Sequence, residues 1–151
     1  RVDYEGELGV VIGRRARDVS EDEALEYVLG YTCFNDVSER YNQRDDGQWT
    51  RAKGYDTFAP LGPCIACGLD PGDLLLETFV NGQRRQAART SDLIFPVPYL
   101  VSFISRVMTL LPGDVIATGT PSGIGRIVPG DVVEVSIEGI GTLRNPVAER
   151  G

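Results

Sequence analysis

The sequence predicts a mainly β domain with few helices, which places it in the α+β class. Short runs rich in β-branched and apolar residues recur along the 151 residues, bounded by glycine or by Pro-Gly-Asp turns. Two segments have the apolar spacing of an amphipathic helix. Because no linker or break in composition interrupts the chain, we expect residues 1–151 to form a single domain.

The N-terminal half is predicted to contain one long strand, one helix and a long loop. Residues 4–13 form a short apolar run closed by glycine, which is typical of a strand. Ser20 and Glu23 have the spacing of a capping box and predict a helix that ends at Gly30, followed by an extended segment. The polar stretch 38–54 is expected to be a surface loop.

The C-terminal half is predicted to be rich in strands. Asn81-Gly82, between residues 75–80 and 83–87, is a strong signal for a β-hairpin. A helix is expected to begin near Pro98, with an inward stripe of Val101, Ile104, Val107, Met108 and Leu111. Further strands are expected around Cys64 and over 115–118, 132–137 and 142–145, which gives about eight strands and two helices.

Charge and composition argue against several classes of function. Fifteen Lys and Arg against 22 Asp and Glu give a net charge of -7, so nucleic acid is not an expected partner. The lack of histidine excludes Ser-His-Asp triads, Cys-His dyads and HExxH zinc sites from this sequence. No apolar run reaches the length of a membrane span, so we expect no membrane partner. Three cysteines, an odd number, do not form a disulfide framework, and the reducing cytoplasm is the expected location.

Cys64 and Cys67 form a CxxC motif. The second cysteine pair or the histidine that would complete a zinc site is missing from the sequence. Strand positions three residues apart also face opposite sides. We therefore interpret both cysteines as small buried residues rather than as metal ligands.

Glu5 and Glu7 share one face of the first predicted strand, because side chains alternate with a period of two. Two like charges on one face repel each other unless a cation or protons compensate. The pair is either a solvated strand face or part of a site for a hard cation such as Mg²⁺, Mn²⁺ or Ca²⁺. Asp36, at the end of the extended segment, is either a turn residue or the third ligand of that site.

Three further features could take part in chemistry. Lys53 is one of very few lysines, and a buried ammonium can act as a proton donor or base, although an exposed loop lysine is the simpler interpretation. Arg40 and Arg51 could bind a carboxylate, yet arginines in loops are usually solvated. The glycine-rich stretch 118–125 lacks the GK[ST] ending of a phosphate loop but could meet an anion through N–H groups and hydroxyls.

Together these segments resemble the fumarylacetoacetate hydrolase family. The matching blocks lie in the family's order and cover nearly the whole chain; they are DYEGELGVVIGRRARDVS, GYTCFNDVSERYNQ, QWTRAKGYDTFAPLGP, FVNGQRRQ, ARTSDLIF, LPGDVIATGTPSGIG and VPGDVVEVSIEGIGTLRNPV. The resemblance implies a fold of mixed β-sheets rolled around a metal site, and usually a homodimer.

The resemblance also implies roles for individual residues. The expected metal ligands are Glu5, Glu7 and Asp36. The expected catalytic proton carrier is Lys53. The expected substrate-binding residues are Arg40, Gln43 and Thr120. The expected ion is Mg²⁺, with Mn²⁺ as the alternative. In the family, the loop that matches Thr120 meets the carboxylate of the substrate.

Family substrates are small 2-oxo acids and their enols, whose carboxylate and 2-oxygen can chelate the ion. A divalent ion at the 2-oxygen would stabilise enolate charge without any histidine. We therefore expect an isomerase of 2-hydroxyhepta-2,4-diene-1,7-dioate, an enol dicarboxylate of aromatic catabolism, which becomes the 2-oxo-3-enoate. Hydrolysis of acylpyruvates such as fumarylpyruvate, decarboxylation of oxaloacetate, and a catalytically silent ion-binding scaffold are the alternatives.

The family's hydrolases are similar to one another in having a His and Glu pair upstream of the block that matches YEGEL. That pair activates the attacking water, and here the block begins at Tyr4. We expect an upstream N-terminal segment to be missing from this chain. A complete chain would favour isomerase or decarboxylase chemistry over hydrolysis.

Overall fold

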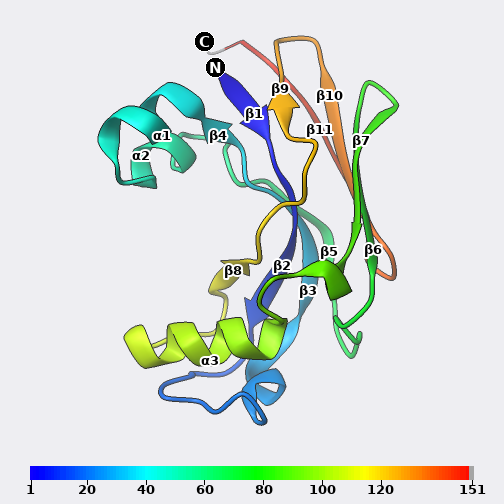
Figure 1. The fold of residues 1–151 in the computed structure, drawn as a ribbon. Coiled ribbons are helices and arrows are strands. Elements are labelled where there is room, and N and C mark those ends of the chain that lie inside the picture. The colour runs from blue at the N-terminus through cyan, green and yellow to red at the C-terminus, as the bar shows by residue number, and fades with distance from the viewer. Residues whose placement is uncertain (150–151) are drawn as a thin grey trace.

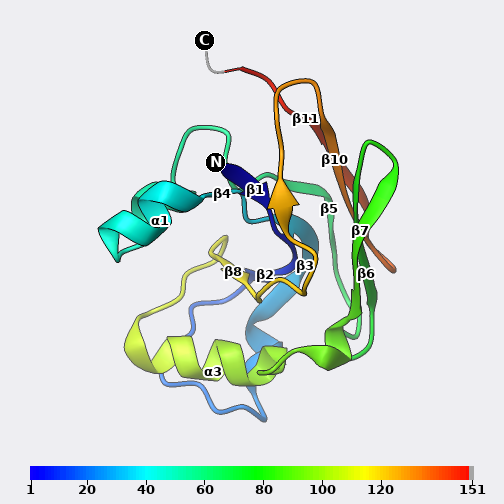
Figure 2. The ribbon, with the colours of Figure 1, turned by 45° about the horizontal axis from the view of Figure 1, so that its top comes forward.

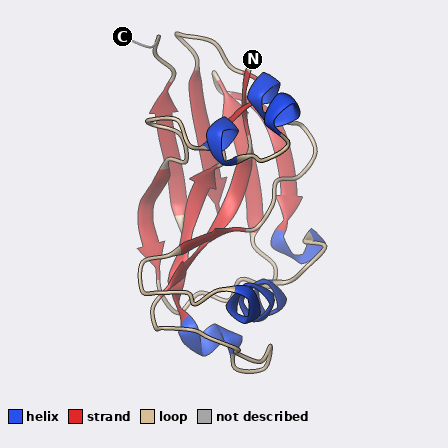
Figure 3. Cartoon of the chain, turned by 90° about the vertical axis from the view of Figure 1, so that its left-hand side faces the viewer, coloured by secondary structure: helices blue, strands red, loops and turns tan. Residues whose placement is uncertain are grey.

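The computed structural model describes residues 1–149 and confirms the mainly β class. These residues form eleven strands, three α-helices and two short 3₁₀ helices. Figure 1 shows the strands as the body of the molecule, with α1 (Arg40–Asp46) and α2 (Thr50–Lys53) near one end and α3 (Val97–Val107) near the other. Figures 2 and 3 show the same arrangement from two further directions.

The strands form three sheets, and every strand pair among residues 1–149 is antiparallel. One sheet has the order β5-β3-β2-β8, from Leu61–Ala66, Val28–Asn35, Gly6–Ile12 and Val115–Ala117. A second has the order β11-β10-β6-β7, from Gly141–Pro146, Val132–Ile137, Leu75–Val80 and Gln83–Arg89. The third has the order β4-β1-β9, from Ser38–Glu39, Val2–Tyr4 and Gly125–Arg126.

Strand β2 is buried along its whole length, which shows that other elements cover both of its faces. Leu8, Val10 and Ile12 belong to the main core, together with residues of β6 and β10 such as Leu76 and Val135. The predicted strand over 4–13 is divided at position 5 into β1 and β2, because the Glu5 N–H donates to the Asn35 side chain (3.0 Å). The face that carries Glu5 and Glu7 therefore points into the protein rather than into solvent.

The predicted helix over 24–30 is wrong in length. Only Ala24–Tyr27 are helical, as the 3₁₀ helix η1, and β3 begins at Val28. The Ser20 hydroxyl donates to the Glu23 carboxylate (2.8 Å) instead of capping a backbone N–H. Pairing with β2 and a close approach of β5 to Gly30, where a Cβ would lie 2.5 Å from the Ala66 oxygen, hold this segment extended.

The predicted surface loop over 38–54 is also wrong, because it folds into β4, α1 and α2. Glu39 caps α1: its carboxylate accepts from the N–H groups of Tyr41 (3.2 Å) and Asn42 (2.7 Å). Gly47, at a φ of 67°, ends that helix in the left-handed conformation. A polar helix has no apolar stripe, so its capping residues were the available signal.

Helix α3 forms where expected, but its inward stripe is only partly as predicted. Val101 is fully buried, whereas Val107, Met108 and Leu111 are more than half exposed. The buried face instead includes Ser102 and Ser105, which bond the Val19 carbonyl (2.7 Å) and the Val19 N–H (3.0 Å). These two hydroxyls fix α3 to the segment before η1, which apolar spacing alone does not reveal.

The hairpin prediction is confirmed by β6 and β7, with Asn81 (φ 53°) and Gly82 (φ 74°) both left-handed at the turn. The prediction that Cys64 and Cys67 are buried is wrong, since both are exposed and only Cys33 is buried. Cys64 lies on β5, a strand at the edge of its sheet, which leaves its side chain accessible. None of the helices within residues 1–149 is long and apolar enough to cross a membrane.

Candidate metal centre

Three carboxylates from two neighbouring segments, β1–β2 and the residue after β3, lie close together in the fold. Glu5 and Glu7 share one face of the β1–β2 segment, and Asp36 directly follows β3. Gly6 pairs with Asn35, and the Asp36 N–H donates to the Glu5 carbonyl (2.8 Å), so the strand register places these residues side by side. One oxygen from each of the three side chains lies within 4.8 Å of the other two. We call Glu5, Glu7 and Asp36 the carboxylate cluster.

The cluster is electrostatically unfavourable by itself. Glu7 is 3% exposed and Glu5 is 8% exposed. Burial, together with the charges of Asp36 and Glu5, raises the pKa of Glu7 to about 7, although the hydrogen bond from the Gly119 N–H and the charge of Lys53 oppose the shift. Burial also raises the pKa of Asp36, although its contact with Lys53 opposes the shift. Like charges held this close in a buried site require protons or a cation.

Lys53, the only lysine in the sequence, supplies part of the compensating charge. It is the last residue of α2, and its Nζ forms ion pairs with Asp36 and with Glu5 (3.2 Å) and donates to the Ser38 hydroxyl (3.0 Å). The ring of Trp49, just before α2, lies 5.7 Å from the same ammonium. Helix α2, which the sequence did not reveal, therefore carries this ammonium to the cluster.

Arg40 and Gln43 lie together at the start of α1. Arg40 Nη1 donates to Gln43 Oε1 (2.9 Å), Nε pairs with Asp3 (2.9 Å), and Nη2 lies 2.6 Å from a Glu5 oxygen. Burial alone would raise the pKa of Asp3, but hydrogen bonds from Arg1 and Arg40 outweigh it and lower the pKa. Asp3 therefore stays ionised and holds Arg40 against the cluster.

The glycine-rich segment after β8 runs beside β2, on the side of Glu7. The Gly119 N–H donates to Glu7 Oε2 (2.7 Å), and the hydroxyls of Thr118 and Thr120 donate to the carbonyls of Leu8 and Gly6 (both 2.9 Å). We call residues 118–121 the Thr120 loop. It borders the carboxylate cluster, so Thr120 lies close to the other predicted site residues.

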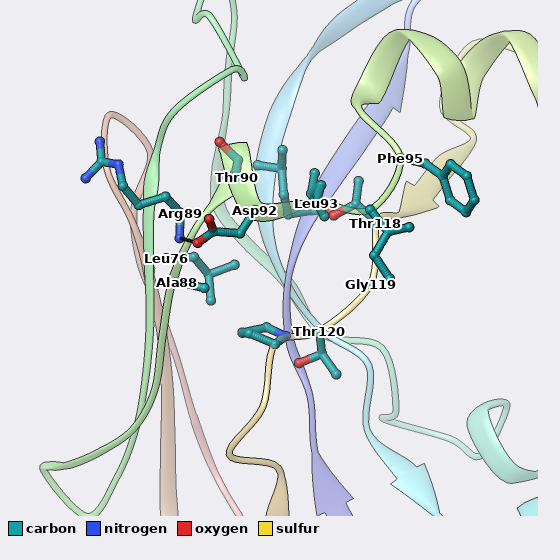
Figure 4. A pocket seen from close by; sticks show the side chains of 13 residues that line it. Leu76, Ala88, Arg89, Thr90, Asp92, Leu93, Phe95, Thr118, Gly119 and Thr120 are labelled. Atoms are coloured by element: carbon teal, nitrogen blue, oxygen red, sulfur yellow. Dashed lines mark hydrogen bonds between the residues drawn. The ribbon is translucent and has the colours of Figure 1, made fainter.

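A cavity of about 310 Å³ lies beside the Thr120 loop. Figure 4 shows Leu76 and Ala88 on one side of this cavity and Thr118, Gly119 and Thr120 on the other. Leu8 also lines it, and adjacent strand residues face opposite sides, so the cavity adjoins the Leu8 face of β2 and not the Glu7 face. None of the three clustered carboxylates lines it.

The structure brings the predicted site residues together, and it adds three that the sequence analysis missed. Asp3 holds Arg40, Ser38 accepts from Lys53, and Gln86 contacts the Thr120 loop. Asp3 has the same strand parity as Glu5 and Glu7, a signal that could have revealed it. Arg51, considered as a carboxylate binder, pairs instead with Asp46 (2.6 Å) at the surface.

The donor set fits a hard divalent cation. Its donors are carboxylate oxygens, without nitrogen or sulfur, which Mg²⁺ and Mn²⁺ prefer over softer metals. The three oxygens lie within 4.8 Å of one another, so this group could hold a metal ion. Fold and site together define a mainly β domain with a buried, lysine-paired candidate metal centre.

A family model described as "Fumarylacetoacetate (FAA) hydrolase C-terminal" matches residues 1–148. The chain therefore belongs to this family, which confirms the resemblance inferred from its sequence. It is 63% identical over 145 residues to an uncharacterised protein of Archaeoglobus fulgidus, covering 96% of this chain and 58% of the relative. This chain thus spans less than two thirds of the length of such curated relatives.

Two similar solved structures come from mycobacteria. One is 2-hydroxyhepta-2,4-diene-1,7-dioate isomerase from Mycobacterium marinum, and the other is 5-carboxymethyl-2-hydroxymuconate delta-isomerase from Mycobacterium smegmatis. Each is 59% identical to this chain, with a TM-score of 0.98, and the match covers 99% of this chain and 60% of the other. The backbone described above is therefore shared closely with isomerases.

Other relatives carry different activities. The 4-hydroxyphenylacetate degradation bifunctional isomerase/decarboxylase of Salmonella dublin is 51% identical, covering 95% of this chain and 34% of the relative. A maleylpyruvate hydrolase from Sphingobium sp. SYK-6, solved in complex with manganese(II) and pyruvate, is 38% identical to this chain, with a TM-score of 0.91. The match covers 99% of this chain and 55% of the hydrolase. The family thus includes isomerases, hydrolases and decarboxylases.

Proposed function

We propose that this chain is the catalytic domain of a divalent-metal-dependent isomerase. Its substrate would be 2-hydroxyhepta-2,4-diene-1,7-dioate, whose enol becomes the 2-oxo-3-enoate. The observation that carries the proposal is the convergence of Glu5, Glu7 and Asp36 with Lys53 in one buried site. The mycobacterial isomerases, at 59% identity, favour this reaction over the others in the family.

In this proposal Glu5, Glu7 and Asp36 hold Mg²⁺ or Mn²⁺. The bound ion would supply a positive charge that polarises an oxygen of the substrate. The maleylpyruvate hydrolase, which was solved in complex with manganese(II), supports the binding of a divalent ion by this chain. The three carboxylates would hold the ion, and a divalent ion of this kind usually takes water or substrate oxygens as well.

The protein's own groups would bind the substrate and move the proton. Lys53 Nζ lies beside two of the proposed ligands. There an ammonium could deliver a proton to C5 of the dienoate, and the resulting amine could take up the proton that the 2-hydroxyl loses. Arg40 and Gln43, next to Glu5, and the Thr120 loop, next to Glu7, border the same space and would bind the substrate carboxylates. Burial of the cluster excludes bulk water and strengthens these interactions.

The decisive experiment measures turnover of the dienedioate before and after chelation. We expect chelation to abolish turnover and either Mg²⁺ or Mn²⁺ to restore it. Glu7→Gln should lose activity and metal binding together, whereas Glu77→Gln, a matched change on β6, should lose neither. Turnover that persists without metal would refute the proposal.

Hydrolysis and decarboxylation are the second candidate, favoured by the maleylpyruvate hydrolase and the bifunctional relative. The same metal site would serve all three reactions. Parallel assays of fumarylpyruvate, acetylpyruvate and oxaloacetate distinguish them. Metal binding by calorimetry, without turnover of any of these acids, would instead indicate a silent ion-binding scaffold.

We also propose that the chain works as a homodimer in the cytoplasm. The exposed apolar face of α3, which includes Phe103 and Val107, supports a protein interface. All three cysteines are free, as in a reducing compartment.

A further inference from the structure

Gln86 is a fully buried polar side chain that the proposed chemistry does not use. It lies on β7 and is 1% exposed. Its Oε1 accepts from the Gly6 N–H (3.0 Å), and its Nε2 donates to the Thr120 hydroxyl (2.8 Å) and to the Pro121 carbonyl (2.9 Å). One side chain thus joins the strand between Glu5 and Glu7 to the Thr120 loop.

These bonds close a ring. Gly6 donates to Gln86, Gln86 donates to Thr120, and the Thr120 hydroxyl donates back to the Gly6 carbonyl (2.9 Å). The direction of every bond is fixed, because a backbone N–H can only donate and the carbonyls of Gly6 and Pro121 can only accept. The amide of Gln86 therefore has one possible orientation, and the hydroxyl hydrogen of Thr120 is already used.

This direction limits what Thr120 can offer a substrate. A carboxylate is an acceptor, so it cannot bond the Thr120 hydroxyl unless the bond to Gly6 breaks. The N–H of Thr120, by contrast, has no hydrogen-bond partner within residues 1–149. The N–H groups of Thr118 and Gly119 are already bonded to Leu8 and Glu7. The Thr120 N–H is therefore the loop donor that remains free, while the Thr120 hydroxyl holds the loop in place.

We infer that Gln86 is a positioning residue for the Thr120 loop. In this arrangement Thr120 contacts the substrate carboxylate through its N–H, while its hydroxyl holds the loop against Gly6. Gln86 and Thr120 then act as one unit. The inference rests on the proposed function in one respect, because it takes a carboxylate as the ligand of the loop.

The experiment is a double-mutant cycle, read by calorimetry with Mn²⁺ and then with oxalate as a probe for a 2-oxo acid. Gln86→Met and Thr120→Val each remove the ring and keep the shape, and we expect each to weaken oxalate binding about tenfold. The double variant should lose about the same tenfold rather than about a hundredfold. Thr120→Ser keeps the hydroxyl and should bind oxalate within about twofold of wild type.

The matched control is Gln83→Met, the same change at an exposed position of β7, which should leave oxalate binding unchanged. Mn²⁺ affinity should change less than oxalate affinity in every variant, because the three carboxylates remain. Should Gln86→Met not fold, the shorter amide of Gln86→Asn, which cannot span both partners, replaces it in the cycle.

Additive losses in the double variant would overturn the inference, since a hydroxyl that contacts the ligand directly does not depend on Gln86. Unchanged oxalate binding in Gln86→Met would overturn it as well. Both results are measured as oxalate binding, so they do not depend on turnover. An enzyme that binds Mn²⁺ and oxalate but converts none of the tested acids would refute the proposed function and still leave the cycle readable.

Discussion

At the scale of single residues, the site is defined by how charge is balanced in a buried space. Three carboxylates converge, one ammonium pairs with two of them, and Glu7 contacts the Gly119 N–H but is not among the ion pairs of Lys53. Burial therefore raises the pKa of Glu7 strongly, and no ion pair of Glu7 with Lys53 offsets the shift. The protein thus keeps a site that is short of positive charge, which is the condition for binding a cation.

Because of Glu7, the folding stability of the metal-free protein should depend on pH. Its pKa is about 7 in the folded state against 4.5 for the ordinary group, so the folded state binds the proton more tightly. The resulting stability is complete below 4.5 and is lost as the pH rises through about 7, which amounts to about 3 kcal/mol. Denaturation with chelator present, at about pH 5 and about pH 8, should show this loss.

Glu7→Gln is the control for that prediction, because an amide does not titrate. The difference in stability between wild type and this variant should shrink with rising pH and then change sign in favour of the variant. A difference that is constant with pH would show that Glu7 keeps an ordinary pKa. Saturating Mn²⁺ should abolish the loss in wild type, since the ion replaces the proton.

Two substitutions of Lys53 should separate the effect of its positive charge from the effect of its proton transfer. Lys53→Met removes both, so it should lower kcat at least about a hundredfold and destabilise the metal-free protein by about 2 kcal/mol. Lys53→Arg keeps the charge but does not titrate, so it should retain most of the stability and still lose turnover. Full turnover in Lys53→Arg would exclude Lys53 as the proton carrier.

At the scale of elements, β2 determines how the carboxylate cluster lies relative to the core, because both faces of this strand are buried. One face carries Glu5 and Glu7, and the other carries Leu8, Val10 and Ile12 into the core. The second sheet approaches this inner face most closely at Gly6, where a Cβ would lie 2.0 Å from the Thr78 hydroxyl oxygen. The glycine between the two glutamates is therefore a requirement of packing.

Gly6→Ala should destabilise the protein by about 1–3 kcal/mol, because the added methyl overpacks the contact between the two sheets. The variant should also weaken metal binding, since β2 must shift, and it carries Glu7 and directly follows Glu5. Gly9→Ala on the same strand is the control: its nearest neighbour would be a Thr32 methyl at 3.0 Å, so we expect a smaller loss. Thermal denaturation measures both, and equal losses would contradict the explanation.

At the scale of the whole molecule, one surface remains apolar. Phe95, Tyr99 and Phe103 stack along α3, with centroid distances of 4.7 Å and 6.0 Å. Ile94 (89% exposed) and Val107 (65% exposed) lie on the same segment. An apolar surface of this kind on a folded domain is typical of a protein interface.

The homodimer proposal predicts a solution mass of about twice 16.5 kDa by sedimentation. Phe103→Glu should reduce the mass to that of one chain, because a charge at the centre of the interface would be buried unpaired. Ile65→Glu, at an exposed apolar position on β5, should leave the dimer intact. A monomeric wild type would refute the homodimer, and a dimeric Phe103→Glu would exclude this face.

The fold class, the family and the candidate residues could all be predicted from the amino-acid sequence. Strand alternation placed Glu5 and Glu7 on one face, and Asn81-Gly82 located the hairpin, because such signals depend only on neighbours along the chain. Three features became visible only in the folded chain: this face is buried, α2 brings Lys53 to it, and Gln86 fixes the direction of the Thr120 hydroxyl. Each of these depends on layers that are distant in sequence, where packing overrides local propensity, as it also did for the predicted helix over 24–30.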